Sequence, residues 1–261
     1  MKELLKYAVP AAVGIAALLL WEWRVRASGI SPLVLAAPSD IWAAFLANFD
    51  LLMSALWTTV RVTSMAFFFA VVGGVFVAIL FSQSRLIEFA FYPFAIVLQV
   101  TPVVAIAPLL LIWIGYDDIT VVLVVLAWII SFFSILSNMV VGLRSADHNL
   151  VDLFKLYGAS RWQIFWRLQL PGALPYLLSG MKVSGGLALI GAVTAELVAG
   201  SGNDTGLGWI ITLAGRNLET AKVFAALALL SALGIAIFFA LTALEWLLLH
   251  RWHDSAVKKQ T

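Results

Sequence analysis

The side chains that could act as catalysts or metal ligands are few in this 261-residue chain and are not arranged for either task. Cysteine is absent, which excludes disulfides and thiolate metal sites. His148, His250 and His253 have no metal-ligand arrangement, and the latter two lie in a basic C-terminal segment that suits lipid headgroups better. No serine–histidine–aspartate or two-carboxylate constellation is identifiable. We therefore expect no catalytic residues, no metal site and no enzymatic activity.

Phosphate-binding chemistry is missing as well. The pattern G-x-x-x-x-G-K-[ST], whose backbone amides cradle phosphates in ATPases, does not occur. The stretch GMKVSGG from Gly180 places a lysine after a glycine, but it has the wrong spacing and lies in an apolar segment. We expect no cofactor on this chain, so any ATP and Mg²⁺ must be bound by a partner.

The composition places the chain in a membrane. It is 63% hydrophobic and 11% charged with a mean hydropathy of +1.02, whereas soluble domains carry about a quarter charged residues. A spanning helix needs about 20 mostly apolar residues, and six segments qualify. We expect one all-α membrane domain over residues 1–261 with about six spans, which lie at residues 7–24, 62–84, 89–116, 119–143, 176–199 and 223–244.

The first of these segments resembles a signal peptide because Lys2 and Lys6 precede a short apolar run. Charged residues stand where a cleavage site would be, so we expect an uncleaved first spanning helix over residues 7–24. Two prolines and the pair Ser39-Asp40 then predict a short external surface helix over residues 39–48.

Lysine and arginine are enriched on the cytoplasmic side of membrane proteins. If both termini are cytoplasmic, eleven of the 16 basic residues lie inside, namely Lys2, Lys6, Arg85, Arg144, Lys155, Arg161, Arg167, Lys182, Arg251, Lys258 and Lys259. We therefore expect both termini, and the charged segment at residues 149–171, to be cytoplasmic.

This charged segment has its own local structure. An apolar face formed by Leu150, Leu153, Phe154 and Tyr157 predicts a helix over residues 149–157. Gly158 follows, as expected of a residue that ends a helix by adopting positive φ.

A second helix is expected to begin at Ser160, where Gln163 three residues later completes a capping box. We expect Pro171 and Pro175 to end or kink that helix. The residues alone leave two interpretations open: a basic connector lying on membrane lipid, or a docking element for a cytoplasmic protein.

The segment resembles the cytoplasmic loop of permease subunits of bacterial ABC importers. That loop reads Glu-Ala-Ala, three residues, Gly, nine residues, Ile, one residue, Leu-Pro. Gly158 is followed by nine residues, then Leu168, and then Leu170-Pro171, while Asp152-Leu153-Phe154 keeps only the acidic character of the first element. The stretch from Tyr157 to Val198 is similar to nitrate/sulfonate/taurine-type permeases, and the likeness extends over roughly residues 35–250.

The resemblance implies an ABC importer permease fold in a bacterial inner membrane. It implies two copies of a cytoplasmic ATPase that binds ATP and Mg²⁺, a periplasmic or surface solute-binding protein, a second copy of this chain, and no nucleic acid. The solute would be a small anion such as a sulfonate, taurine or nitrate, with a pyrimidine-type vitamin precursor or an aromatic acid as the alternative. The implied docking residues are Asp152, Lys155, Leu156, Tyr157, Gly158, Ala159, Ser160, Arg161, Leu170 and Pro171.

Polar residues within the apolar segments suggest a solute pathway, since such residues in kinked helices often line transport paths. This candidate set contains Gln99, Thr101, Thr194 and Glu196. The alternative for the neutral members is bonding to neighbouring backbone, and for Glu196 it is pairing with Arg216 or capping of the external loop.

Small residues spaced three or four apart let membrane helices approach closely. They predict either a subunit interface in a homodimer or packing within the chain, and they are Gly180, Ser184, Ala188, Gly191, Ala192 and Ala195.

Two rival functions come from other classes. A stand-alone secondary transporter or channel would need coupling-ion carboxylates deep in the membrane or an inverted repeat, and neither is recognisable. A membrane scaffold that only recruits a cytoplasmic protein would show no solute-stimulated ATPase activity once the complex is reconstituted.

Overall fold

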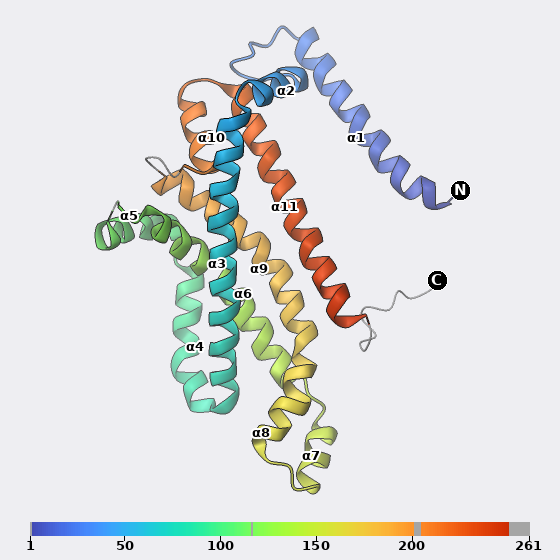
Figure 1. Cartoon of the computed structure of the whole chain (residues 1–261), viewed down its shortest axis with the longest axis vertical. Coiled ribbons are helices and arrows are strands. Elements are labelled where there is room, and N and C mark those ends of the chain that lie inside the picture. The colour runs from blue at the N-terminus through green and yellow to red at the C-terminus, as the bar shows by residue number, and fades with distance from the viewer. Residues whose placement is uncertain (1, 116, 201–204, 251–261) are drawn as a thin grey trace.

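A computed structural model describes residues 2–115, 117–200 and 205–250, and this part of the chain is helical and contains no strand. The helices are α1 (Lys2–Ala27), α2 (Pro38–Ala47), α3 (Phe49–Gln83), α4 (Arg85–Val100), α5 (Val103–Ile114), α6 (Ile119–Arg144), α7 (His148–Leu156), α8 (Arg161–Ile164), the π-helical turn η1 (Phe165–Gln169), α9 (Leu170–Ala199), α10 (Leu207–Arg216) and α11 (Thr220–Leu249). Figure 1 shows an elongated bundle with α7 and α8 at one end and α2 and α10 at the other.

The expected all-α membrane fold is confirmed, with five or six spans. Five helical segments in the described residues are long and apolar enough to cross a membrane, and the α4–α5 pair, bent by 99°, adds a sixth if it forms one broken span. The break falls at Thr101 and Pro102, whose ψ angles of 127° and 109° are extended. Pro102 has no N–H to donate, and its ring disfavours helical geometry at Thr101. Pro93 and Pro108, in contrast, lie inside α4 and α5.

The core is built where α6 packs against α3 and α9. Lipid is as apolar as these helices, so their association depends on close van der Waals packing. At the closest approach, a Cβ atom on Gly191 would lie 2.8 Å from the Cα atom of Ala127 in α6. Ser184 adds an inter-helix hydrogen bond, its Oγ donating to the carbonyl of Ser131 at 3.0 Å.

The predicted subunit interface on α9 requires correction. All six small residues of the row are buried within the chain, and they are Gly180, Ser184, Ala188, Gly191, Ala192 and Ala195. Intramolecular packing, chiefly against α6, occupies this face, which was the alternative left open by the sequence.

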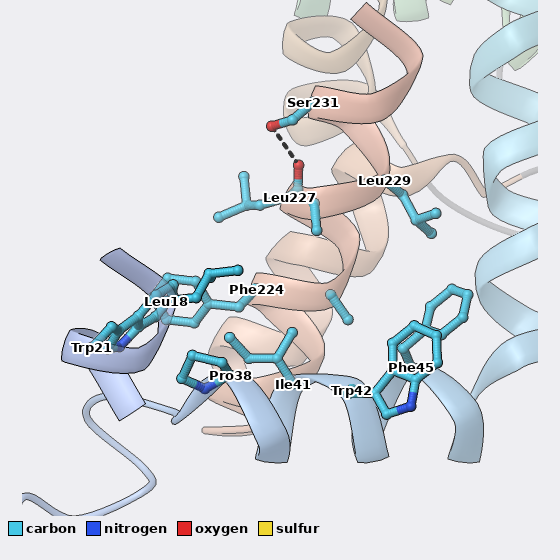
Figure 2. A pocket seen from close by; sticks show the side chains of 12 residues that line it. Leu18, Trp21, Pro38, Ile41, Trp42, Phe45, Phe224, Leu227, Leu229 and Ser231 are labelled. Carbon is cyan, nitrogen blue, oxygen red and sulfur yellow. Dashed lines mark hydrogen bonds between the residues drawn. The ribbon is translucent and has the colours of Figure 1, made fainter. Parts of the chain in front are cut away.

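Helix α1 diverges from the bundle and joins it near α2 (Figure 1). There the ring of Trp21 meets that of Phe224 edge-on at a centroid distance of 5.5 Å, and Arg26 donates to Ser39 and Asp40 at 2.9 Å each. An apolar groove of about 690 Å³ lies between α1, α2 and α11 (Figure 2). Most of the apolar surface of α1 is thus left exposed by this chain.

Within the described residues, ion pairs also connect helices away from the α2 end. Arg144 at the end of α6 pairs with Glu88 in the first turn of α4. Lys182 in α9 pairs with Glu245 in α11, with Nζ 2.5 Å from Oε2.

We predict that Glu245→Leu alone destabilises the protein more than the double substitution Lys182→Met/Glu245→Leu. Removing one partner leaves a charge without its counter-ion, whereas removing both leaves an apolar contact. Because both side chains are 26% exposed, the single change should cost about 2 kcal/mol, less than a fully buried pair would. Thermal unfolding in detergent tests this, and equal losses in the single and double variants would contradict it.

Candidate functional site

The helix α7 projects from the bundle at the end opposite α2 and α10 (Figure 1). It begins at Asp147, whose side chain accepts a hydrogen bond from the backbone N–H of Asn149 at 2.9 Å. On its exposed surface Lys155 Nζ donates to Asp152 Oδ1 at 2.9 Å, and this hydrogen bond lowers the pKa of the Asp152 carboxyl. Leu150 and Leu153 remain 44% and 45% exposed, so the chain itself does not cover the apolar face of this helix.

Gly158 closes α7 in the way the sequence predicts, with a φ of +75°. The N–H of Ala159 donates to the carbonyl of Phe154 at 3.0 Å, and that of Gly158 donates to Lys155 at 2.9 Å. This pair of bonds is the Schellman arrangement, which satisfies helix-end carbonyls and requires a left-handed residue at the glycine position. The hinge between α7 and α8 is therefore a closed turn.

The next helix starts with the predicted capping box. Ser160 Oγ accepts from the Gln163 N–H at 3.3 Å, and Gln163 Oε1 accepts from the Ser160 N–H at 2.7 Å. Reciprocal capping satisfies two helix-start donors. Both sides of the hinge are thus held by local bonds.

Pro171 and Pro175 were expected to end or kink this second helix, and in the described structure they do not end it. The helical path runs from Arg161 to Ala199 and counts as one segment. The turn η1 precedes Pro171, and there the Leu170 N–H donates to the carbonyl of Phe165. Such a widened turn helps a helix to admit a proline, which has no N–H to give. The hinge loop is consequently continuous with the spanning helix α9.

The docking residues predicted between Asp152 and Arg161 lie on α7 and around the hinge, whereas Leu170 and Pro171 lie at the start of α9. Leu156 and Tyr157 are 85% and 84% exposed. Beside them lies a hollow of about 350 Å³, which is lined by Leu153, Phe154, Tyr157, Gly158, Ala159, Gln163 and Arg167. Ala159 and Leu170 are partly buried, while the remaining docking candidates are exposed, namely Asp152, Lys155, Gly158, Ser160, Arg161 and Pro171. Exposed apolar side chains around a hollow are typical of a protein-docking surface.

The candidate pathway residues differ in their local environments. Thr101 and Thr194 each donate to a carbonyl one turn earlier in their own helices, at 2.6 Å and 2.7 Å, which is the backbone bonding considered as their alternative. Gln99 is exposed on α4. Glu196 is fully buried, so it is removed from the pathway set.

Glu196 instead caps the start of α10. Its Oε2 accepts from the Gly208 N–H at 2.8 Å and from Thr59 Oγ1 at 3.1 Å. Thr59 Oγ1 in turn accepts from the Leu207 N–H at 2.9 Å. Capping of the external loop was one alternative for Glu196, but Thr59 was missed, because a threonine in an apolar helix carries no sequence signal for so distant a partner.

Comparisons with known proteins agree with this architecture. Residues 70–250 match the family described as "binding-protein-dependent transport system inner membrane component". The chain is 31% identical to the formylaminopyrimidine transport permease of Halalkalibacterium halodurans, covering 95% of this chain and 98% of that one. It is 30% identical to the taurine transport system permease of Escherichia coli, covering 91% and 88%.

A riboflavin transport permease of Chloroflexus aurantiacus is 39% identical over 66% of this chain and 62% of its own length. Among solved structures, the inward-facing MetNI methionine ABC transporter aligns with a TM-score of 0.64 at 20% identity, covering 76% of this chain and 95% of that one. This last similarity concerns the fold.

Proposed function

This chain belongs to the family of binding-protein-dependent transport system inner membrane components and is a permease subunit of an ABC importer, and we propose that its α7–α8 hinge docks on a separate cytoplasmic ATPase subunit. The ATPase would bind ATP and Mg²⁺ and hydrolyse the nucleotide. The chain would supply the membrane passage and carry no catalytic residue. Both termini and the hinge would then lie in the cytoplasm.

One observation carries this proposal: the exposed hinge is locally closed and continuous with α9. The hinge joins a Schellman turn and a capping box beside a hollow with exposed apolar side chains, which is typical of a protein-docking surface. A surface that receives force benefits from both, because locally bonded turns resist deformation. The residues we propose for contact are those around the hinge, centred on Leu156, Tyr157 and Gly158.

The proposed assembly contains two copies of this chain, two ATPase subunits and one external solute-binding protein. Closed twofold symmetry is the commonest way to build such a pair. The buried face of α9 is occupied, so its opposite, exposed stripe is available to face the second copy or the passage. That stripe consists of Ser179, Val183, Gly186 and Ile190, and Gln99, Thr101 and Thr194 remain candidates for contact with solute.

We propose a small anion, such as a sulfonate, taurine or nitrate, as the solute. The taurine permease relative supports this choice. A pyrimidine-type vitamin precursor is the second candidate, because the formylaminopyrimidine permease relative matches nearly the full length of both chains.

The docking proposal predicts that an ATPase subunit co-purifies with this chain from its native membrane at about one copy per permease. Mass spectrometry of a mild-detergent pull-down measures this ratio, with an unrelated membrane protein bearing the same tag as control. If the chain purifies without an ATPase subunit, docking at the hinge is refuted.

The solute proposal predicts ATP-dependent uptake of taurine or an alkanesulfonate into proteoliposomes that contain the permease, its ATPase and its binding protein. The same vesicles are tested with nitrate and with a formylaminopyrimidine. Uptake of the pyrimidine alone would replace the anion with the second candidate.

A further inference from the structure

Three elements that are distant in sequence meet at the carboxyl group of Glu196. This residue lies in the last turn of α9, Thr59 lies in α3, and Gly208 lies in the first turn of α10. Three buried hydrogen bonds join these elements: Thr59 to Glu196, Gly208 to Glu196, and Leu207 to Thr59. Buried hydrogen bonds fix relative positions strongly, because no water can replace a lost partner.

The backbone of α10 fits closely around that carboxyl group. A Cβ atom on Gly206 would lie 2.0 Å from Glu196 Oε1. Any residue other than glycine at this position would therefore displace the carboxyl group. A Cβ atom on Gly208 would lie 2.7 Å from the carbonyl oxygen of Val193, in the backbone of α9. The start of α10 is therefore held against α9 through backbone contact as well as hydrogen bonds.

We call the hydrogen-bonded group of Glu196, Thr59, Leu207 and Gly208 the clamp. Helix α9 connects this clamp to the hinge at the opposite end of the molecule. The continuous helical segment runs from Arg161, beside the hinge, to Ala199, three residues beyond Glu196. Figure 1 shows the hinge and α10 at opposite ends of the bundle. A displacement of the hinge along or about this helix would reach α10 directly if the clamp holds.

We propose that Glu196 and Thr59 are positioning residues that make α10 move as one body with the outer end of α9. This inference rests on the proposed function, because it assumes that an ATPase displaces the hinge. In this mechanism a binding protein delivers solute to the external face. Helix α10 is the part of that face that moves when the hinge moves. The clamp thus couples nucleotide-driven motion on one side of the membrane to the surface on the other.

The test compares Thr59→Val with Thr59→Ser. Valine has a similar shape but removes every hydrogen bond of the hydroxyl, namely those with Glu196, Leu207 and the Ala55 carbonyl, whereas serine keeps a hydroxyl at this position. In the purified permease–ATPase complex, we expect Thr59→Val to retain basal ATPase activity. We expect stimulation of that activity by solute-loaded binding protein to fall at least fivefold, and serine to restore it. Glu196→Ala should behave as Thr59→Val does.

A distance measurement separates coupling from folding. Spin labels replace Leu197 on α9 and Leu213 on α10, which are 40% and 44% exposed. On the otherwise unaltered chain we expect one narrow distance, unchanged between nucleotide-free and ATP-bound complexes. We expect the distribution to broaden when Thr59→Val is added.

The proposal is overturned if the label distance changes between nucleotide states without Thr59→Val, since α10 would then move independently. It is also overturned if Thr59→Val keeps full stimulation, or if the variant lowers only the yield of complex. Failure of the proposed function looks different: the unaltered chain would then assemble with no ATPase at all.

Discussion

Replacing Gly158 with leucine should abolish ATP-driven solute uptake by the assembled importer. The φ of +75° at this position is costly for a residue with a Cβ atom, by about 1–2 kcal/mol. Relaxing φ to a negative value would break the two bonds that close α7 and would redirect α8. The leucine side chain would also project beside the hollow at the proposed docking surface.

We expect uptake at the background level and loss of most of the co-purified ATPase subunit, while the chain itself remains inserted in the membrane. Gly158→Asn is the matched control, because asparagine tolerates the left-handed conformation better than other side chains. It should retain most of the uptake. Full transport by the leucine variant would refute the hinge as a docking element and leave the loop as a membrane-surface connector.

The second large effect is expected for Gly191→Leu, which should prevent accumulation of the folded chain. A Cβ atom at this position meets the backbone of Ala127 at 2.8 Å, and backbone cannot move aside as a side chain can. The leucine would force α6 and α9 apart along the central contact of the bundle. Overpacking of this kind costs about 1–3 kcal/mol in ordinary cores, and more where two backbones touch.

Gly172→Leu is the control, since it lies on the same helix, is exposed and has no atom within 4 Å of the added Cβ position. Size-exclusion chromatography in detergent should show a monodisperse peak for the Gly172 variant and aggregate for the Gly191 variant. A well-folded Gly191→Leu protein would mean that the α6–α9 contact is looser than described here.

The class of the protein and the hinge followed from local sequence features. Apolar segments long enough to span a bilayer are recognisable one at a time, because each must satisfy its own backbone bonds in lipid. The hinge could be predicted for a similar reason. The φ of Gly158 and the capping box of Ser160 and Gln163 depend on residues a few positions apart.

Only the structure shows which prolines interrupt a helix. The sequence marks Pro102 and Pro171 equally as possible helix breaks, yet only the first breaks a helix. The second lies at the start of α9, directly after the π-helical turn. Which solution the chain adopts depends on the packing of the flanking helices as well as on the proline itself.

Long-range partners were decided by tertiary structure alone. The row of small residues on α9 is equally suited to another chain or to α6, and only packing shows that α6 occupies it. Glu196 and Thr59 are 137 positions apart, and nothing in either neighbourhood identifies the other. Local hydrogen bonding is determined by residues a few positions apart, whereas the choice of a distant partner depends on how whole helices pack.

For this protein the sequence by itself therefore determined the membrane class and the hinge. The tertiary structure decided which faces are occupied and which residues hold α10 to the end of α9.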